Sequence, residues 1–287
     1  MSRSFRPALM PATLVLALAA AAPAAQAAES YDNCTGFIDS LPATISTQGV
    51  WCLRKNLSTA MNTGAAILIA GNNITIDCNE FKVGGLPAGN TTMAYGIEAE
   101  NRLNATIRNC GIRGFSRGVW LHGGGGGHNV EHNRLDANYS GGIMIIGAEN
   151  SRVFDNRVFD TGGSPSGVVA TGIQVDGDAI DNTVSMVFGV QANLTAYGIV
   201  AHGIGSEVRG NRVRHLMATG SGFARGVSAM SGSMTVTGNR ISNPAATAGE
   251  GVYSYTTNAF CTHNTVSNFA NPYFSCDFSA NNLPVLP

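Results

Sequence analysis

The sequence predicts an all-β fold, a single-stranded parallel β-helix (solenoid) of about eight rungs with ends pinned by disulfides. Two observations predict the solenoid: an Asn that recurs in one local context, and a Gly-aliphatic pair about ten to thirteen residues before it. The recurring residues are Asn79, Asn133, Asn156, Asn182, Asn211, Asn239 and Asn264. With Cys110 in the same register, the intervals are 31, 23, 23, 26, 29, 28 and 25 residues, as in solenoid repeats.

Short strands are expected between these Asn residues. Residues 172–176 and 236–241 alternate apolar and polar side chains, and Gly, Asn and Ser separate such segments. No helical pattern intervenes, so the strands cannot form a doubly wound sheet but can stack as rungs. Asn tolerates the left-handed backbone region, so we expect it at a tight corner, with side chains hydrogen-bonded from rung to rung.

One domain accounts for the whole repetitive region, because 287 residues with 36 Gly and 12% charged residues show no internal boundary. We expect the rungs between Ala66 and Asn268, with one aliphatic side chain of each rung in a single inward stack. This stack is predicted to contain Ile97, Val119, Ile143, Ile173, Ile199, Val227 and Val252.

The first residues are typical of a leader. Arg3 and Arg6 precede the apolar run 14–22, and Ala-Gln-Ala at 25–27 suits cleavage, so residues 1–27 are predicted to be a secretory signal peptide. An uncleaved anchor is the alternative, although the run is shorter than the ~20 residues that span a bilayer. Residues 28–287 would then form the β-helix, with an N-terminal cap at about 28–62 and a C-terminal cap at about 268–287.

Charge and hydropathy narrow the partners of the exported chain. Without Arg3 and Arg6, Lys and Arg fall from 17 to 15 against 18 acidic residues, which gives a net charge of −3 and argues against a nucleic-acid partner. No later segment is apolar enough to span a membrane. We expect a monomer in the periplasm or outside the cell, and the Ala-rich leader favours a bacterial source.

Six cysteines in an oxidising compartment are expected to form three disulfides. Cys78 and Cys110 would face each other on neighbouring rungs, about 4.8 Å apart. Cys34–Cys52 and Cys261–Cys276 would hold caps over the open sheet edges at the two ends. Zinc is the alternative, but the sequence has no C-x-x-C pair.

Residues 49–53 (Gly-Val-Trp-Cys-Leu) and 72–79 (Asn-Asn-Ile-Thr-Ile-Asp-Cys-Asn) resemble the first rungs of right-handed parallel β-helix proteins of the pectin-lyase-like superfamily. The resemblance covers about residues 45–270 and is greatest to carbohydrate-binding and sugar-hydrolase repeat modules. It implies a right-handed helix and a secreted polysaccharide-binding or polysaccharide-modifying protein, which if active would be a lyase, glycoside hydrolase or epimerase. A noncatalytic structural or surface β-helix is the alternative.

The catalytic patterns of these families are missing. The chain has no Asn-Thr-Asp, Asp-Asp or Gly-His-Gly set of the polygalacturonases and no Asp-Pro-His-Asp of the alginate epimerases. A candidate site must therefore come from the outer face of the strands, where the two-residue period defines two rows. The first row is Glu98, Trp120, Met144, Gln174, Val200, Ser228 and Tyr253. The second row is Glu100, His122, Ile146, Asp176, His202, Met230 and Tyr255.

The second row contains two acid–imidazole neighbours. We predict His122 and His202 as candidate acid/base residues, with Glu100 and Asp176 as their respective orienting partners, and at most one pair as catalytic. Ordinary solvated surface residues are the alternative. Aromatic faces can stack on sugars, and polar side chains can bind their hydroxyls. The candidate substrate-binding residues are Trp120, Gln174, Tyr253 and Tyr255.

Metal and arginine patterns give weaker indications. The sequence requires no cofactor and leaves a divalent cation open. His122, His128 and His132 are the metal candidates, but no helix is predicted there to bring residues four apart onto one face, and residues 129–133 belong to a corner. Arg117 and Arg225 precede Gly-aliphatic pairs and could meet acidic sugars. Other arginines recur around the Asn corners, which favours a structural or solubilising role. These are Arg152, Arg157, Arg209, Arg212, Arg214 and Arg240.

Overall fold

The computed structural model describes residues 31–256 and 259–285, so the predicted signal peptide and the first residues of the N-terminal cap lie outside the described residues. Within this part the chain makes about nine turns, and all paired strands are parallel. Each full turn contributes to three ladders of strands. The one helical element of the described chain, the 3₁₀ turn η1 (Leu86–Ala88), is too short to cross a membrane.

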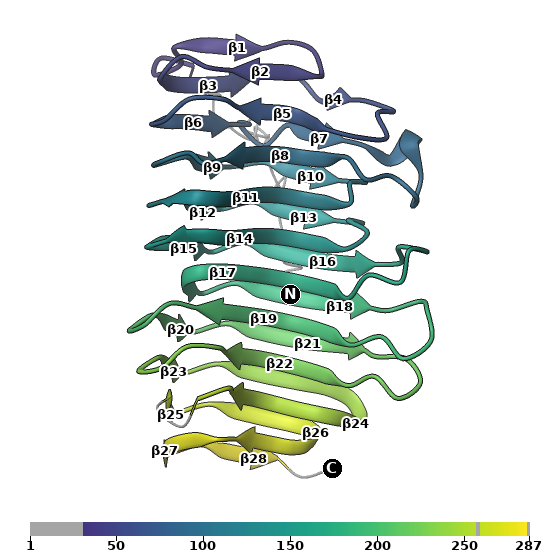
Figure 1. The fold of residues 1–287 in the computed structure, drawn as a ribbon, viewed down its shortest axis with the longest axis vertical. Coiled ribbons are helices and arrows are strands. Elements are labelled where there is room, and N and C mark those ends of the chain that lie inside the picture. Colours follow the sequence, from purple (N-terminus) through teal and green to yellow (C-terminus); the bar gives the residue numbers. More distant parts are fainter. Residues whose placement is uncertain (1–30, 257–258, 286–287) are drawn as a thin grey trace, which may run out of the picture. The chain divides into compact units, whose positions relative to one another are not determined.

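The first ladder runs the length of the solenoid and is shown in Figure 1. It contains β2 (Ala43–Ile45), β5 (Ala65–Ile69), β8 (Tyr95–Glu100), β11 (Arg117–Gly126), β14 (Gly141–Glu149), β17 (Ala170–Ile180), β19 (Ala196–His202), β22 (Ala224–Ala229) and the ends of β24 (Arg240–Ser254) and β26 (Thr265–Phe274).

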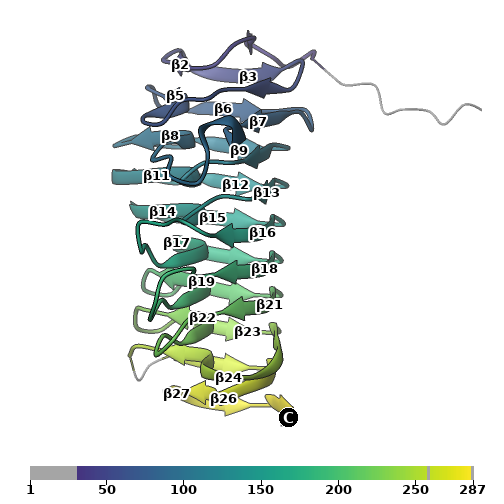
Figure 2. The same cartoon turned by 90° about the vertical axis from the view of Figure 1, so that its right-hand side faces the viewer.

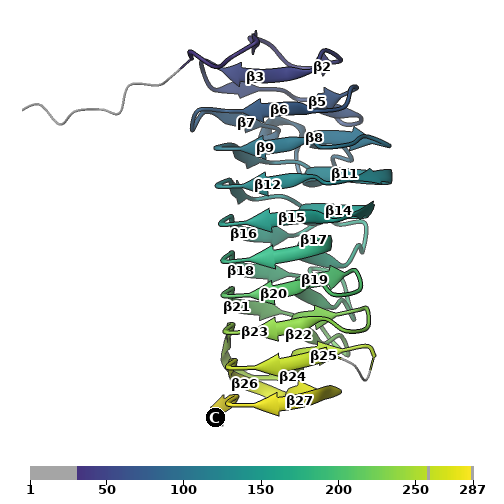
Figure 3. The same ribbon diagram turned by 90° about the vertical axis from the view of Figure 1, so that its left-hand side faces the viewer.

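The second ladder forms the column shown in Figure 3. It contains β1 (Gly36–Ile38), β3 (Gly49–Leu53), β6 (Ile74–Asp77), β9 (Thr106–Arg108), β12 (Asn129–Glu131), β15 (Ser151–Phe154), the end of β17, β20 (Glu207–Arg209), β23 (Thr235–Thr237), β25 (Ala259–Thr262) and β27 (Cys276–Ala280).

The third ladder is seen in Figure 2. It contains β4 (Leu57–Ser58), β7 (Lys82–Gly84), β10 (Gly111–Arg113), β13 (Arg134–Asp136), β16 (Arg157–Gly162), β18 (Thr183–Phe188), β21 (Arg212–Met217), the start of β24, β26 (Thr265–Phe274) and β28 (Leu283–Val285).

The predicted inward stack is confirmed. Val119 pairs with Ile97 on one side and with Ile143 on the other, and the register continues unbroken to Val252. All seven side chains of the stack are fully buried, and Ile67 extends it by one rung. The fold class and the parallel arrangement expected from the repeat are therefore observed.

The glycine of each Gly-aliphatic pair lies where neighbouring rungs approach most closely. A Cβ on Gly198 would lie 2.4 Å from the carbonyl oxygen of Gly226 and 2.4 Å from Val213 Cγ1. A Cβ on Gly118 would lie 2.8 Å from the carbonyl oxygen of Gly142. Close packing between rungs, and not an unusual backbone angle, therefore requires glycine here.

The predicted hydrogen bonding between stacked Asn side chains is confirmed at the corner between the second and third ladders. Asn156 Nδ2 donates to Asn182 Oδ1 at 3.1 Å, and Asn182 Nδ2 donates to Asn211 Oδ1 at 3.1 Å. The backbone N–H of each residue also donates to the next side chain, so buried polar groups are satisfied from rung to rung. We call the buried residues of this corner the Asn ladder: Asn133, Asn156, Asn182, Asn211, Asn239 and Asn264.

Two details of the Asn prediction were wrong. At each residue of the Asn ladder the left-handed residue is the one before it, as at His132 (φ 56°) and Asp155 (φ 48°), whereas Asn79 (φ 45°) is itself left-handed as expected. Asn79 is not part of the Asn ladder, and its Nδ2 donates to the carbonyl of Leu53 at 3.3 Å. The corner that contains Asn79 has four residues between β6 and β7, whereas the same corner of the next turn has two residues between β9 and β10. The longer corner shifts Asn79 out of register with the Asn ladder.

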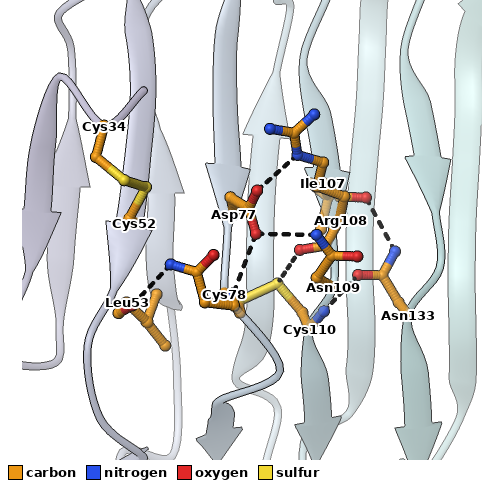
Figure 4. Close-up of polar contacts among 11 residues, drawn as sticks. Cys34, Cys52, Leu53, Asp77, Cys78, Ile107, Arg108, Asn109, Cys110 and Asn133 are labelled. Carbon is orange, nitrogen blue, oxygen red and sulfur yellow. Dashed lines mark hydrogen bonds and ion pairs between the residues drawn. A yellow bond between two sulfur atoms is a disulfide. The ribbon is translucent and has the colours of Figure 1, made fainter. Parts of the chain in front are cut away.

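All three predicted disulfides are present: Cys34–Cys52, Cys78–Cys110 and Cys261–Cys276. Cys78 and Cys110 join neighbouring turns with their Cα atoms 4.7 Å apart, as the register predicted. Beside them, Asp77 accepts hydrogen bonds from Arg108 Nε at 2.7 Å and Asn109 Nδ2 at 3.1 Å (Figure 4). Three disulfides are typical of proteins in oxidising compartments.

Candidate functional site

Both predicted outer rows lie on the outer face of the first ladder. Trp120 pairs with Glu98 in the first row, and His122 pairs with Glu100 in the second. Asp176 pairs with His202, also in the second row. The register therefore brings each predicted acid–imidazole pair onto neighbouring strands.

The carboxylate that contacts His122 is nevertheless Glu98, and not the expected Glu100. His122 Nε2 lies 3.2 Å from Glu98 Oε1, and both side chains are about four-fifths buried, whereas Glu100 is exposed. Long side chains reach diagonally between rows, so ladder register alone does not fix the partner. With Nε2–H donating to this carboxylate, Nδ1 is the nitrogen left to accept a proton.

Trp120 is held in a stack of side chains. Its ring lies 4.6 Å from the His122 ring at an interplanar angle of 20°. The Arg117 guanidinium lies 4.2 Å from the Trp120 ring centroid and 5.5 Å from that of Tyr95. A cation, an indole, an imidazole and a carboxylate thus form one cluster on β8 and β11. We call Glu98, Arg117, Trp120 and His122 the β8–β11 cluster.

A third outward row was not predicted as a row, although two of its members, Arg117 and Arg225, were singled out from the sequence. It consists of the residue directly before each paired glycine: Tyr95, Arg117, Gly141, Thr171, Tyr197, Arg225 and Glu250. Gly118 and Val119 are both buried, so strict alternation breaks there, and counting back by two from Trp120 gives a buried glycine. The signal that could have found this row is the frequent polar or aromatic residue before those glycines.

The C-terminal part of the same face is filled by its own side chains. Arg225 Nε pairs with Glu250 Oε2 at 2.9 Å, and the Arg225 guanidinium lies 3.6 Å from the Tyr253 ring centroid. Tyr253 also stacks on Phe274 at 5.3 Å and 9°. Of the predicted sugar-binding aromatics, Tyr255 is the one that is largely exposed, at 67%.

His202 and Asp176 do not form the expected pair. The Asp176 carboxylate accepts the backbone N–H of Gly147, and among the described residues no hydrogen bond or ion pair joins it to His202. His202 instead lines a mostly apolar depression of about 380 Å³ on this face. The depression also contains Met144, Val168, Val169, Thr171, Gln174, Tyr197, Val200, Arg225 and Met230.

The three histidines considered for a metal take separate places. His128 is buried, and its Nδ1 accepts the backbone N–H of Ala105 at 3.1 Å. Burial lowers the pKa of His128 from 6.5 to about 4, so it is neutral near pH 7. His132 lies at a corner, 3.7 Å from Asp155. Within residues 31–256 and 259–285, no three His, Cys, Asp or Glu side chains gather as ligands for one ion.

Comparison with known proteins identifies the family. The profile of the right-handed β-helix region matches residues 65–268, so the chain belongs to that family. Sequence comparison with curated proteins gives no match.

Two solved structures illustrate the structural similarity. The A-module of mannuronan C-5 epimerase AlgE4 from Azotobacter vinelandii superposes with a TM-score of 0.53 at 12% identity, covering 84% of this chain and 80% of the module. A mutant of the periplasmic alginate epimerase AlgG superposes with a TM-score of 0.50 at 13% identity, covering 85% of this chain and 76% of the AlgG chain. At such identities the likeness shows the fold alone.

Proposed function

We propose that this protein binds a polysaccharide along the outer face of the first ladder and transfers a proton to or from it at His122. The observation that carries the proposal is the β8–β11 cluster. In this cluster an imidazole contacts a carboxylate through Nε2 and keeps Nδ1 as a proton acceptor. In the second acid–imidazole pair, Asp176 and His202, no such contact forms.

Arg117 favours an acidic sugar chain. Its guanidinium lies over Trp120, its Nη1 lies 3.4 Å from the Tyr95 hydroxyl, and no carboxylate pairs with it among the described residues. Arginine binds carboxylates through a planar fork, so a sugar carboxylate can take that place. With Arg117 neutralising the sugar carboxylate, His122 as a base could abstract a proton from the sugar, as in a lyase or epimerase. A glycoside hydrolase normally presents two carboxylates that flank the bond to be cleaved.

The similar structures are consistent with this class. AlgE4 is a mannuronan C-5 epimerase and AlgG is an alginate epimerase, and both have the same fold. Export also supports the proposal, because the three disulfides and the predicted leader at residues 1–27 suit the periplasm or the outside of the cell.

A noncatalytic surface β-helix is the second candidate. The observation that favours it is the self-filled face around Tyr253, where Arg225, Glu250 and Phe274 occupy the space that a sugar ring would take. A protein of this kind would bind polysaccharide without product, or would not bind it at all.

The test incubates residues 28–287 with a panel of acidic and neutral polysaccharides. Product is followed as unsaturated ends, reducing ends and epimerised sugars detected by NMR. We expect His122→Ala to lower turnover by about 100-fold or more while binding remains. Trp120→Ala should weaken binding, and His202→Ala should have little effect. If all three variants keep wild-type affinity and turnover, this face is ordinary surface. If they weaken binding and no substrate ever gives product, the protein is a binding module.

A further inference from the structure

The outer face of the third ladder carries a row of arginines, whereas the β8–β11 cluster lies on the first ladder. Arg157 pairs with Thr183, which pairs with Arg212, which pairs with Arg240. Arg214 lies on the same face, two residues after Arg212. All four arginines are exposed. We call Arg157, Arg212, Arg214 and Arg240 the arginine stripe; its strands β16, β18 and β21 stack in Figure 2.

No acidic side chain among the described residues pairs with the arginine stripe. In the part of the chain that the structure describes, none of its four guanidinium groups has an ion pair, a hydrogen bond or a stacked ring. Most other arginines are engaged: Arg209 pairs with Glu207 at 3.1 Å, and Arg152 lies 4.2 Å from the Phe154 ring centroid. The Asn ladder already holds the nearby corner, so the stripe has no structural contact to explain its repetition.

Two shallow depressions run along the stripe and combine guanidinium groups with hydroxyls. One, of about 290 Å³, is lined by Arg212, Arg214, Arg240, Ile241, Ser242, Thr265 and Ser267. The other, of about 410 Å³, is lined by Arg157, Val158, Phe159, Thr183, Ser185, Met186, Arg212 and Arg214. Arg212 and Arg214 belong to both, so the two depressions adjoin.

We propose that the arginine stripe is a docking surface for a linear polysaccharide with one anionic group per sugar. Arginine forks bind carboxylates and sulfates through paired N–H donors, and the hydroxyls suit the remaining sugar oxygens. Rungs repeat about every 4.8 Å, close to the length of one sugar in an extended chain, so anions on adjacent sugars can meet the adjacent rungs of Arg212 and Arg240. Arg157 lies two rungs from Arg212, with Thr183 between them, so it can meet an anion two sugars further along. The stripe would hold the protein on an acidic matrix, and it does not depend on catalysis at His122.

A single-stranded nucleic acid fits this surface less well. Such ligands need free aromatic rings on which bases stack. The ring in the depressions is Phe159, and the Arg134 guanidinium already lies 4.6 Å from its centroid. A lipid surface would need a broad basic patch, whereas the stripe is a narrow line along the solenoid.

The test measures binding of fluorescent polygalacturonate and dextran sulfate oligomers in a Trp120→Ala background, so that contacts at the proposed site are weakened. The stripe variant is Arg212→Gln/Arg214→Gln/Arg240→Gln. The matched control, Arg54→Gln/Arg152→Gln/Arg209→Gln, removes the same charge elsewhere. We expect at least about tenfold weaker binding for the stripe variant and less than about twofold for the control. The salt dependence of binding should also flatten in the stripe variant.

Three outcomes would overturn the proposal. Equal losses in the two triple variants would mean that only net charge matters, and wild-type binding by the stripe variant would mean that the stripe has no role. Tighter binding of a single-stranded oligonucleotide than of either polysaccharide would assign the surface to another partner. Circular dichroism of each variant confirms that the fold is intact.

Discussion

The Asn ladder and the outer face of the first ladder repeat with the same turns but differ in sequence. The Asn ladder keeps one residue type over six turns, from Asn133 to Asn264. The first outer row changes at every turn, through Glu, Trp, Met, Gln, Val, Ser and Tyr. Repetition is required where each buried side chain must satisfy the next, and it is not required where side chains face outward. Positions that vary from turn to turn are therefore free to carry function.

The largest effect is expected inside the Asn ladder. Asn182→Ala removes the acceptor of Asn156 N–H and the donors to Val153 O and Asn211 Oδ1, so it leaves several buried polar groups unpaired. We expect the free energy of unfolding to fall by about 4 kcal/mol, measured by chemical denaturation. Asn62→Ala, an exposed control, should change it by less than about 0.5 kcal/mol. Equal effects at the two sites would show that the ladder is not the stabilising element.

The fold could be predicted because its determinants repeat. One period placed Ile97 to Val252 on a single inward row, and the same register paired Cys78 with Cys110. Asn79 was misplaced because its corner has two more residues than the next turn, and sequence spacing does not show which corner is enlarged.

The candidate site could be predicted only as a face. Register placed His122 and Trp120 together on it. The choice of Glu98 over Glu100 depends on side-chain rotamers, which have no period. Ser228 is fully buried although it belongs to an outward row, and the two-residue period of the strands does not predict that burial.

His128 tests the corner between the first and second ladders, where no single residue type repeats. The ring Nδ1 of His128 accepts the backbone N–H of Ala105, and the backbone N–H of His128 donates to Ser151 Oγ. His and Ser side chains therefore accept backbone N–H groups of the neighbouring rung at this corner, as Asn side chains do at the other. Burial lowers the pKa of His128 from 6.5 to about 4, so below pH 6.5 the unfolded chain binds a proton that the folded chain does not. The stability that the neutral His128 ring contributes to the folded state is fully present above pH 6.5 and is lost as the pH falls to about 4.

We expect this loss to amount to about 3 kcal/mol of unfolding free energy between pH 7 and pH 4. His128→Gln should remove that part of the pH dependence, whereas His132→Gln, at an exposed position, should keep it. Denaturation curves at several pH values measure it. The same slope in wild type and His128→Gln would contradict a buried neutral imidazole.

A smaller effect is expected where rungs touch through glycine. Gly198→Ala places a methyl group 2.4 Å from the Gly226 carbonyl oxygen, so neighbouring rungs must separate, at a cost of about 2 kcal/mol. Gly124→Ala is the control, because its Cβ would meet its nearest atom at 3.7 Å. Thermal unfolding compares the two. A neutral Gly198→Ala would mean that the rungs are less tightly stacked than the inward row indicates.

The smallest effect on stability is expected at Glu98 and Glu100, the two carboxylates beside His122. Comparing their alanine variants is also the most specific test of function. Glu98→Ala removes the group 3.2 Å from Nε2, whereas Glu100→Ala removes an exposed neighbour of equal charge. Both should change the unfolding free energy by less than about 1 kcal/mol. Glu98→Ala alone should shift the ring ¹⁵N resonances of His122 and lower any turnover by at least about tenfold, because the ring loses its orienting acceptor. If Glu100→Ala has the larger effect on both readouts, the register pair predicted from sequence is the working pair, and the contact with Glu98 is incidental.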